Sequence, residues 1–180
     1  MKFQKCDVND AWFIEPSPHL DERGRFMRAW CQQEFEEHSI NFHPVQANMA
    51  YSIKKGTLRG LHYQIAPSPE AKLVRCTRGS VFDLVADLRP DSSTYLKWFG
   101  TELSAENGHM LFVPEGCAHG CLSLKDDTEI LYLTSAFYAP QCARGVRFDD
   151  PELAIQWPED VAVVSEQDRN WPLINNNPET

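Results

Sequence analysis

The sequence lacks the features of exported and membrane-spanning proteins. Its first residues, MKFQKCDVND, contain no apolar signal segment, and no run reaches the roughly 18 apolar residues that a membrane helix requires. Internal repeats, low-complexity tracts and linkers are also missing. We therefore expect a cytoplasmic protein without membrane contact, forming a single domain over residues 1–180 with a loose tail at 174–180.

Cysteine pairs of the C-x-x-C kind are absent, although the chain contains six cysteines. Disulfide frameworks are typical of small secreted domains that cannot bury a sufficient core. A chain of 180 residues with 42% hydrophobic content can build one sizeable core without them. Free thiols in a reducing compartment are therefore expected.

The sequence also has no excess of basic residues. It carries 17 Lys and Arg against 26 Asp and Glu, a formal net charge of −9. Because such a field repels phosphate, we expect no non-specific binding of nucleic acid. Any anionic substrate must be held by a local group of arginines.

Short β-strand patterns fill the middle of the chain. Runs at 72–77, 80–88, 109–114 and 129–134 are apolar and are separated by clusters of Gly, Pro, Asn and Asp. This spacing is typical of an antiparallel sandwich or barrel. Short helices are expected at 31–39 and from Ser165.

One turn pattern is more specific. Gly108, Pro114, Gly116 and His119 reproduce the second cupin motif, G-x5-P-x-G-x2-H. Proline and glycine allow the sharp reversal that aims His119 back into a barrel. The sequence therefore predicts an all-β protein with a cupin-type double-stranded β-helix, or jelly-roll barrel, and a few short helices.

The first cupin motif is only half present. Gly56 and His62 have the expected spacing, but Gln64 stands where metal-binding cupins carry a second histidine, and Glu70 is displaced. Divalent metals need three or four convergent donors. A glycine-rich dinucleotide loop is absent as well. We therefore expect neither a metal nor another cofactor, and proton transfer is the better use for the histidines.

An alternative metal site is formally available on one strand. Cys117, His119 and Cys121 would place soft donors on alternate residues, all facing one way. Buried free cysteine usually behaves as a small hydrophobe. This alternative is therefore the less favoured one.

From RGLHYQ at 59–64 onward, the sequence resembles the dTDP-4-dehydrorhamnose 3,5-epimerase family. Further matching segments are DERGRF at 21–26, KLVRCTRGSVFDLVADLR at 72–89, VPEGCAHG at 113–120 and SEQDRNWPL at 165–173. The resemblance implies an enzyme that inverts C3, C5 or both in a nucleotide-diphosphate-4-keto-6-deoxyhexose during deoxysugar biosynthesis. It also implies a homodimer that pairs through exchanged strands.

The resemblance assigns four residues to proton handling. A keto group acidifies the protons on its neighbouring carbons, so that a base can leave an enolate and an acid on the opposite face can invert the centre. His62 resembles the family's base, and Asp168 resembles its carboxylate partner. Lys72 would stabilise the oxyanion, and Tyr132 would be the acid.

Each of the four assignments has a structural alternative. His62 fits a hydrogen-bonded core histidine, and Lys72 fits a strand lysine that points to solvent. Tyr132 fits core packing with a satisfied hydroxyl. Asp168 also completes a helix capping box with Ser165.

Seven further residues resemble the family's substrate-binding positions. Arginines among them suit a diphosphate, because their forked donors match phosphate oxygens. The seven are Arg23, Phe26, Gln46, Asn48, Arg59, His119 and Tyr138.

Two details of the strands lead to structural predictions. Arg59 and His62 are three residues apart and would face opposite sides of a regular strand, so Gly60 should mark a bulge. Asp83 shares a face with Val81 and Val85 on another strand, where its inward carboxylate would pair with Lys72.

The chain departs from the family's pattern at three positions. Arg28 and Ala143 stand where the family usually has glutamate, and Phe137 replaces the first of a frequent tyrosine pair. These departures leave the nucleotide and the sugar open. A monoepimerase of C3 or C5 and a non-catalytic cupin that binds a sugar nucleotide are the alternatives, whereas a metal-dependent cupin oxygenase or isomerase is disfavoured by Gln64.

Overall fold

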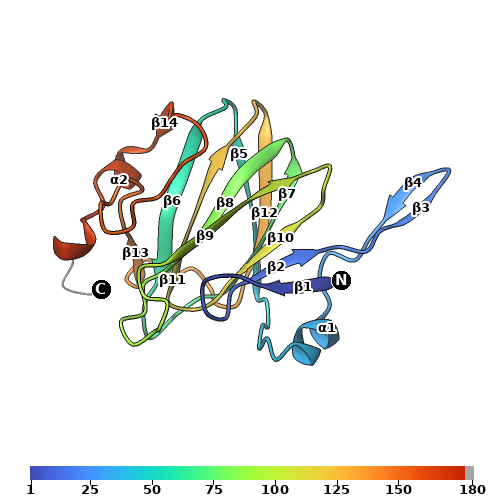
Figure 1. Cartoon of the computed structure of the whole chain (residues 1–180), viewed down its shortest axis with the longest axis horizontal. Coiled ribbons are helices and arrows are strands. Elements are labelled where there is room, and N and C mark those ends of the chain that lie inside the picture. Colours follow the sequence, from blue (N-terminus) through green and yellow to red (C-terminus); the bar gives the residue numbers. More distant parts are fainter. Residues whose placement is uncertain (177–180) are drawn as a thin grey trace.

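Two antiparallel sheets pack against each other in the structure, a computed structural model that describes residues 1–176 (Figure 1). The first sheet has the order β1 (Lys2–Lys5), β2 (Trp12–Glu15), β10 (Met110–Val113), β7 (Lys72–Arg78), β12 (Thr128–Thr134) and β5 (Gln46–Ser52). The second has the order β13 (Ala143–Gly145), β6 (Thr57–Gln64), β11 (Cys117–Ser123), β8 (Ser80–Asp87) and β9 (Trp98–Ser104). The predicted all-β architecture is confirmed.

Alternation along the strands explains how the core forms. On β7, Val74 and Cys76 face the interior and pack with residues of the second sheet such as Val85. Leu73 points to the opposite face, where it packs with Phe35 of α1 (Gln32–Glu37). Because side chains alternate with a period of two, β7 contributes to both layers. Lys72 shares the inner face with Val74.

The second cupin motif forms the predicted strand, turn and returning strand. β10 ends at Val113, Cys117 N–H donates to the Pro114 carbonyl at 3.3 Å, and β11 begins at Cys117. Gly116 has a φ of +77°, and a Cβ there would lie 2.6 Å from Cγ of Arg89. Glycine is therefore needed both for the turn and for the close approach.

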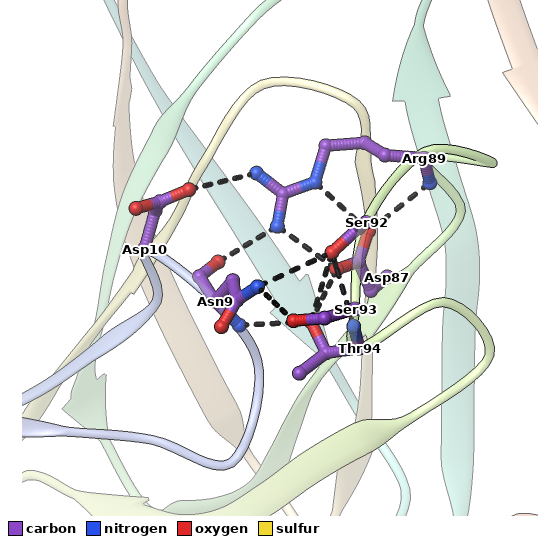
Figure 2. Close-up of polar contacts among 7 residues, drawn as sticks. All are labelled: Asn9, Asp10, Asp87, Arg89, Ser92, Ser93 and Thr94. Carbon is purple, nitrogen blue, oxygen red and sulfur yellow. Dashed lines mark hydrogen bonds and ion pairs between the residues drawn. The ribbon is translucent and has the colours of Figure 1, made fainter.

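A polar network ties the end of β8 to the N-terminal loop (Figure 2). Arg89 donates to both carboxylate oxygens of Asp87, at 2.8 and 2.9 Å, and to Asp10 at 3.0 Å. Thr94 also donates to Asp87, at 2.6 Å. Burial alone would raise the pKa of Asp87, but the hydrogen bonds from Arg89, Ser92 and Thr94 hold it well below its usual value.

The short helices lie where the sequence predicts them. α1 covers the outer face of the first sheet, and α2 (Glu166–Arg169) follows β14 (Val163–Val164), a short strand parallel to β6. Residues Ile174–Asn176 form a 3₁₀ turn in which Ile174 is buried and donates to Asp150 at 2.7 Å. The sequence predicts a loose tail from residue 174, whereas Ile174 is packed against the domain. Residues 177–180 lie outside the described residues.

A hairpin of β3 (His19–Asp21) and β4 (Gly24–Phe26) projects from the barrel (Figure 1). Its residues are exposed along both strands, including Leu20 and Phe26 at 76% each. Within residues 1–176, no helix is long and apolar enough to cross a membrane. All six cysteines are free, as expected.

Candidate active site

An imidazole–carboxylate pair lies between β6 and α2. Nε2 of His62 lies 2.5 Å from Oδ1 of Asp168. The Asp168 side chain is only 6% exposed, and its second oxygen accepts the Gly60 N–H at 3.2 Å. Because the carboxylate accepts a hydrogen bond, the proton of a neutral His62 ring is on Nε2. Nδ1 then keeps its lone pair.

α2 delivers Asp168 to this pair. Ser165 is the N-cap, and its Oγ accepts the backbone N–H of Asp168 at 3.0 Å. The capping box is therefore half formed, because the Asp168 carboxylate turns to His62 instead. Burial would raise the pKa of Asp168, but the hydrogen bond and charge of His62 lower it below its ordinary value.

A β-bulge at Gly60, as predicted, directs the side chains of Arg59 and His62 into the same cavity. His119 pairs with His62, but Cys121 pairs with Arg59, so one extra residue is accommodated on β6. Gly60 has a φ of +125°, and a Cβ there would lie 2.6 Å from Cα of Gly120. Arg59 donates to the Ser52 hydroxyl at 3.2 Å and to the Tyr51 carbonyl at 2.7 Å.

Lys72 points inward from the start of β7. Its side chain is 7% exposed, and Nζ donates to the His62 carbonyl at 3.2 Å and pairs with Glu70 at 2.9 Å. The predicted pair with Asp83 was wrong, because Asp83 instead lies 2.8 Å from Nε2 of His119. Asp83 and His119 lie on neighbouring strands of the second sheet. Lys72, in contrast, begins β7 of the first sheet, and Glu70 precedes it by two residues.

Tyr132 comes from β12, in the sheet that faces His62. Its hydroxyl has no hydrogen-bond partner among residues 1–176, unlike a satisfied core tyrosine. Burial, and next the charge of Glu70, raises the pKa of Tyr132 above its ordinary value. The phenol is therefore protonated at neutral pH.

These groups line two adjoining cavities of about 360 and 520 Å³, which together form the central cavity. His62, Lys72 and Tyr132 line both. The smaller part is also lined by the predicted residues Gln46, Asn48 and Tyr138, and the larger part by Arg59, His119 and Asp168. A separate cavity of about 530 Å³ touches Trp12, His38 and Arg89 and contains none of the four predicted proton-handling residues.

Two predicted substrate-binding residues are not brought to the central cavity of their own chain. Arg23 and Phe26 lie on the projecting hairpin (Figure 1), where the Arg23 side chain is 85% exposed and bound to Asp21. Conversely, sequence reasoning missed Trp171 and Gln167 as lining residues. Both lie in SEQDRNWPL, so their neighbourhood to Asp168 was the available signal.

The residues considered as metal ligands have other partners. Gln64 is bonded to backbone groups, and His119 to Asp83. Burial raises the pKa of the Cys117 thiol to about 12 and also raises that of Cys121. Over residues 1–176, no group of three or more His, Cys, Asp or Glu side chains is arranged to hold a metal ion.

An imidazole–carboxylate pair and a protonated phenol lie on facing sheets of one jelly-roll barrel, an arrangement that suits acid–base chemistry. The model of the dTDP-4-dehydrorhamnose 3,5-epimerase family matches residues 5–176. The chain therefore belongs to this family. The predicted family, its cupin-type barrel and its class, carbohydrate epimerase, are thereby confirmed.

Individual relatives match over nearly the full length. The dTDP-4-dehydrorhamnose 3,5-epimerase of Methanothermobacter thermautotrophicus is 41% identical, over 98% of this chain and 96% of that protein. The crystal structure of the enzyme from Elizabethkingia anophelis has a TM-score of 0.94 at 40% identity, covering 98% of this chain and 99% of that one. The Bacillus anthracis enzyme, solved with TDP and PPi bound, has a TM-score of 0.92 at 37% identity and covers 96% and 99%.

Proposed function

We propose that this chain inverts C3 and C5 of a nucleotide-diphosphate-4-keto-6-deoxyhexose by removing and returning protons beside the keto group. The observation that carries the proposal is the position of His62 and Tyr132. They line one cavity but come from facing sheets. A sugar ring between them meets a base on one face and an acid on the other, as inversion requires.

His62 takes the proton from carbon. The Nδ1 lone pair of His62 accepts the proton. The C–H electron pair of the sugar then forms the C=C bond of the enolate, and the π pair of the keto group moves onto its oxygen. The imidazolium that forms is stabilised by the adjacent Asp168 carboxylate. Asp168 also fixes the ring, because it accepts from Nε2 and is itself held by the Gly60 N–H and by α2.

Lys72 stabilises the enolate. Its ammonium lies in the same cavity and is hydrogen-bonded to the carbonyl of His62 at 3.2 Å. A cation already desolvated by the barrel needs little reorganisation when negative charge develops, which is why such groups often supply several kcal/mol. Glu70 holds Nζ at 2.9 Å and orients it.

Tyr132 returns the proton to the opposite face. Burial raises the pKa of its hydroxyl, which keeps the proton available at neutral pH. The enolate carbon takes that proton, and the phenolate regains one from solvent. His62 likewise releases its proton to solvent, so the enzyme is unchanged after each inversion.

We propose that the working form is a homodimer in which the β3–β4 hairpin of each copy enters the other. Support comes from Leu20 and Phe26, two large apolar side chains that are each 76% exposed on the projecting hairpin. The hairpin also carries Arg23, whose guanidinium would join Arg59 in holding a diphosphate. Light scattering at micromolar concentration tests this, and a monomer would contradict it.

The catalytic proposal is tested by solvent exchange. The protein is incubated in deuterium oxide with nucleotide-4-keto-6-deoxyhexoses, and NMR locates the deuterium. Deuterium at both C3 and C5 with inversion supports a double epimerase, whereas one labelled and inverted carbon identifies a monoepimerase. No uptake with any of them would overturn the proposal and leave a binding protein.

Two substitutions separate the base from the acid. His62→Ala should abolish both exchange and inversion, because no proton leaves carbon. Tyr132→Phe should suppress inversion more than exchange, since His62 can still return a deuteron to the original face. A near-normal exchange rate in His62→Ala would refute the assignment of the base.

The nucleotide is the least constrained part of the substrate. Ala143 lines the smaller part of the central cavity, where it offers no side-chain acceptor, while Arg28 lies outside it and pairs with Glu34 at 2.6 Å. Each buried hydrogen-bonding group left unpaired costs about 1–3 kcal/mol. We propose that this pocket discriminates between nucleotides differently from one with a carboxylate at position 143. Calorimetric titration of dTDP, UDP, CDP and GDP tests this, and a tenfold or larger preference for dTDP would contradict it.

A further inference from the structure

Gln64 occupies the position at which metal-binding cupins carry their second histidine, and it has acquired different partners. It ends β6, is 2% exposed, and lies two residues after His62 on the same face of the strand. Its side chain therefore enters the central cavity with His62. Within residues 1–176, the hydrogen bonds of its side chain go to backbone groups of two connections, the segment 65–71 and the segment 135–142.

One amide holds both sides of a single residue, Tyr138. Nε2 of Gln64 donates to the Phe137 carbonyl at 3.3 Å and to the Ser68 carbonyl at 3.0 Å. Oε1 accepts the Ala139 N–H at 2.7 Å. Two donors and one acceptor on one short side chain are available from glutamine but not from histidine, whose ring has only two nitrogens.

A second glutamine reaches the same segment from the facing sheet. Gln46, at the start of β5, accepts the Tyr138 N–H through Oε1 at 3.3 Å. Its own Nε2 donates to Asn48 at 3.0 Å, which orients the amide. The backbone of Phe137–Ala139 is thus held by both sheets.

The two aromatic side chains of the segment 137–139 are exposed. Phe137 is 69% exposed and Tyr138 is 64% exposed, and Tyr138 lines the central cavity. An aromatic ring that is exposed on a well-held backbone presents its π face in a defined direction at low entropic cost.

We propose that Gln64 is a positioning residue for substrate binding, which fixes Phe137–Ala139 so that Tyr138 forms one wall of the cavity for a nucleoside diphosphate. The inference rests on the proposed function, because it takes Tyr138 to contact the nucleotide part of the substrate. At this position of the barrel, Gln64 would thus support substrate binding, whereas the histidine of metal-binding cupins binds a metal.

Gln64→Leu is the direct test, since leucine has a similar volume and no hydrogen-bonding group. Affinity for the nucleoside diphosphate that binds the wild-type chain most tightly should fall about ten- to fiftyfold in calorimetry. The reason is that the segment 137–139 must then lose its conformational entropy when the ligand binds. KM for the nucleotide sugar should rise in proportion, while kcat changes less than about threefold. Gln33→Leu, on the exposed face of α1, is the matched control and should change neither value.

Hydrogen exchange shows whether the effect travels through the segment. The Ala139 amide, bonded to Gln64 in the wild type, should lose protection in Gln64→Leu, with no change at β8 in the core. Gln64→Glu keeps the acceptor for Ala139 but loses both donors, so it should be intermediate in protection and affinity. If Gln64→Leu does not fold, Gln46→Ala, which removes the hydrogen bonds to Tyr138 and Asn48, should lower the protection of the Tyr138 amide, and unchanged protection there would overturn the inference.

A double-mutant cycle with Tyr138→Ala decides the mechanism. If Gln64 acts through Tyr138, Gln64→Leu should weaken binding less than about twofold in the Tyr138→Ala background. Additive effects, unchanged Ala139 protection, or a loss confined to kcat would overturn the inference. No loss of affinity on Tyr138→Ala alone would overturn it as well. Failure of the proposed function looks different, because the wild-type chain would then bind a nucleoside diphosphate but take up no deuterium with any nucleotide-4-keto-6-deoxyhexose.

Discussion

The Asp168→Asn variant tests the imidazole–carboxylate pair most directly. Asparagine keeps the shape of the side chain and can still accept from Nε2 of His62, but it removes the negative charge that lies 2.5 Å from the ring. That charge acts chiefly when His62 becomes an imidazolium during proton abstraction. The substitution should therefore raise the barrier to reaction more than it weakens substrate binding.

The size of the effect follows from Coulomb's law. Two unit charges whose centres are about 4 Å apart interact by about 4 kcal/mol at an effective dielectric constant of about 20. The His62 side chain is 43% exposed, so solvent screening reduces this to about 2–3 kcal/mol. At about 1.4 kcal/mol per tenfold, kcat should fall about 30- to 150-fold.

The assay is steady-state turnover of a nucleotide-4-keto-6-deoxyhexose, with deuterium exchange measured on the same samples. KM should stay within about threefold, because the hydrogen bonds of Asp168 go to protein groups. Asp149→Asn, which breaks a surface pair with Arg147 at 2.7 Å, is the control and should change kcat less than twofold. A kcat of Asp168→Asn within threefold of the wild type would refute the role of the charge.

The remaining predictions concern the strand bulge and the polar network at the end of β8. Gly60→Ala should lower the free energy of unfolding by about 2–4 kcal/mol, because its Cβ would meet the Gly120 Cα at 2.6 Å and the His119 carbonyl oxygen at 2.8 Å. Gly24→Ala, at a φ of +122° but with open space around the Cβ, should lose only about 1–2 kcal/mol in urea titration, and equal losses would contradict the clash. Asp87→Asn should cost about 3 kcal/mol at pH 7, since it leaves the partly buried Arg89 with less compensation. Because the folded-state pKa of Asp87 is depressed, the stability that its carboxylate contributes is complete above pH of about 4 and is lost as pH falls. The variant should therefore lose less stability between pH 5 and pH 2 than the wild type. Parallel curves of unfolding free energy against pH would contradict this.

Local patterns in the sequence determined much of the barrel. The spacing of Gly108, Pro114, Gly116 and His119 predicted the turn from β10 to β11, because only a few residue types permit such a reversal. Period-2 alternation exposed the conflict between Arg59 and His62, which the bulge at Gly60 resolves.

The resemblance, in contrast, selected residues whose proximity no local pattern contains. His62 and Asp168 are 106 residues apart in sequence, and they meet because α2 follows β14, which pairs with β6. Alternation states which face a side chain occupies, but not which side chain of a facing strand lies opposite. The sequence therefore did not show that Asp83 pairs with His119 of the neighbouring strand β11 and not with Lys72.

The sequence by itself determined the strand patterns, the turns, the two short helices and, through its motifs, the family. Only the tertiary structure decided the partners of Gln64. In the sequence this residue marks a missing metal ligand, whereas in the fold its side chain is hydrogen-bonded to the backbone of Phe137 and Ala139. The tertiary structure also separated Arg23 and Phe26 from the cavity of their own chain. The physical reason is that side-chain identity fixes which hydrogen bonds a residue can make, whereas its partners depend on strand order and register, which are set by packing over the whole chain.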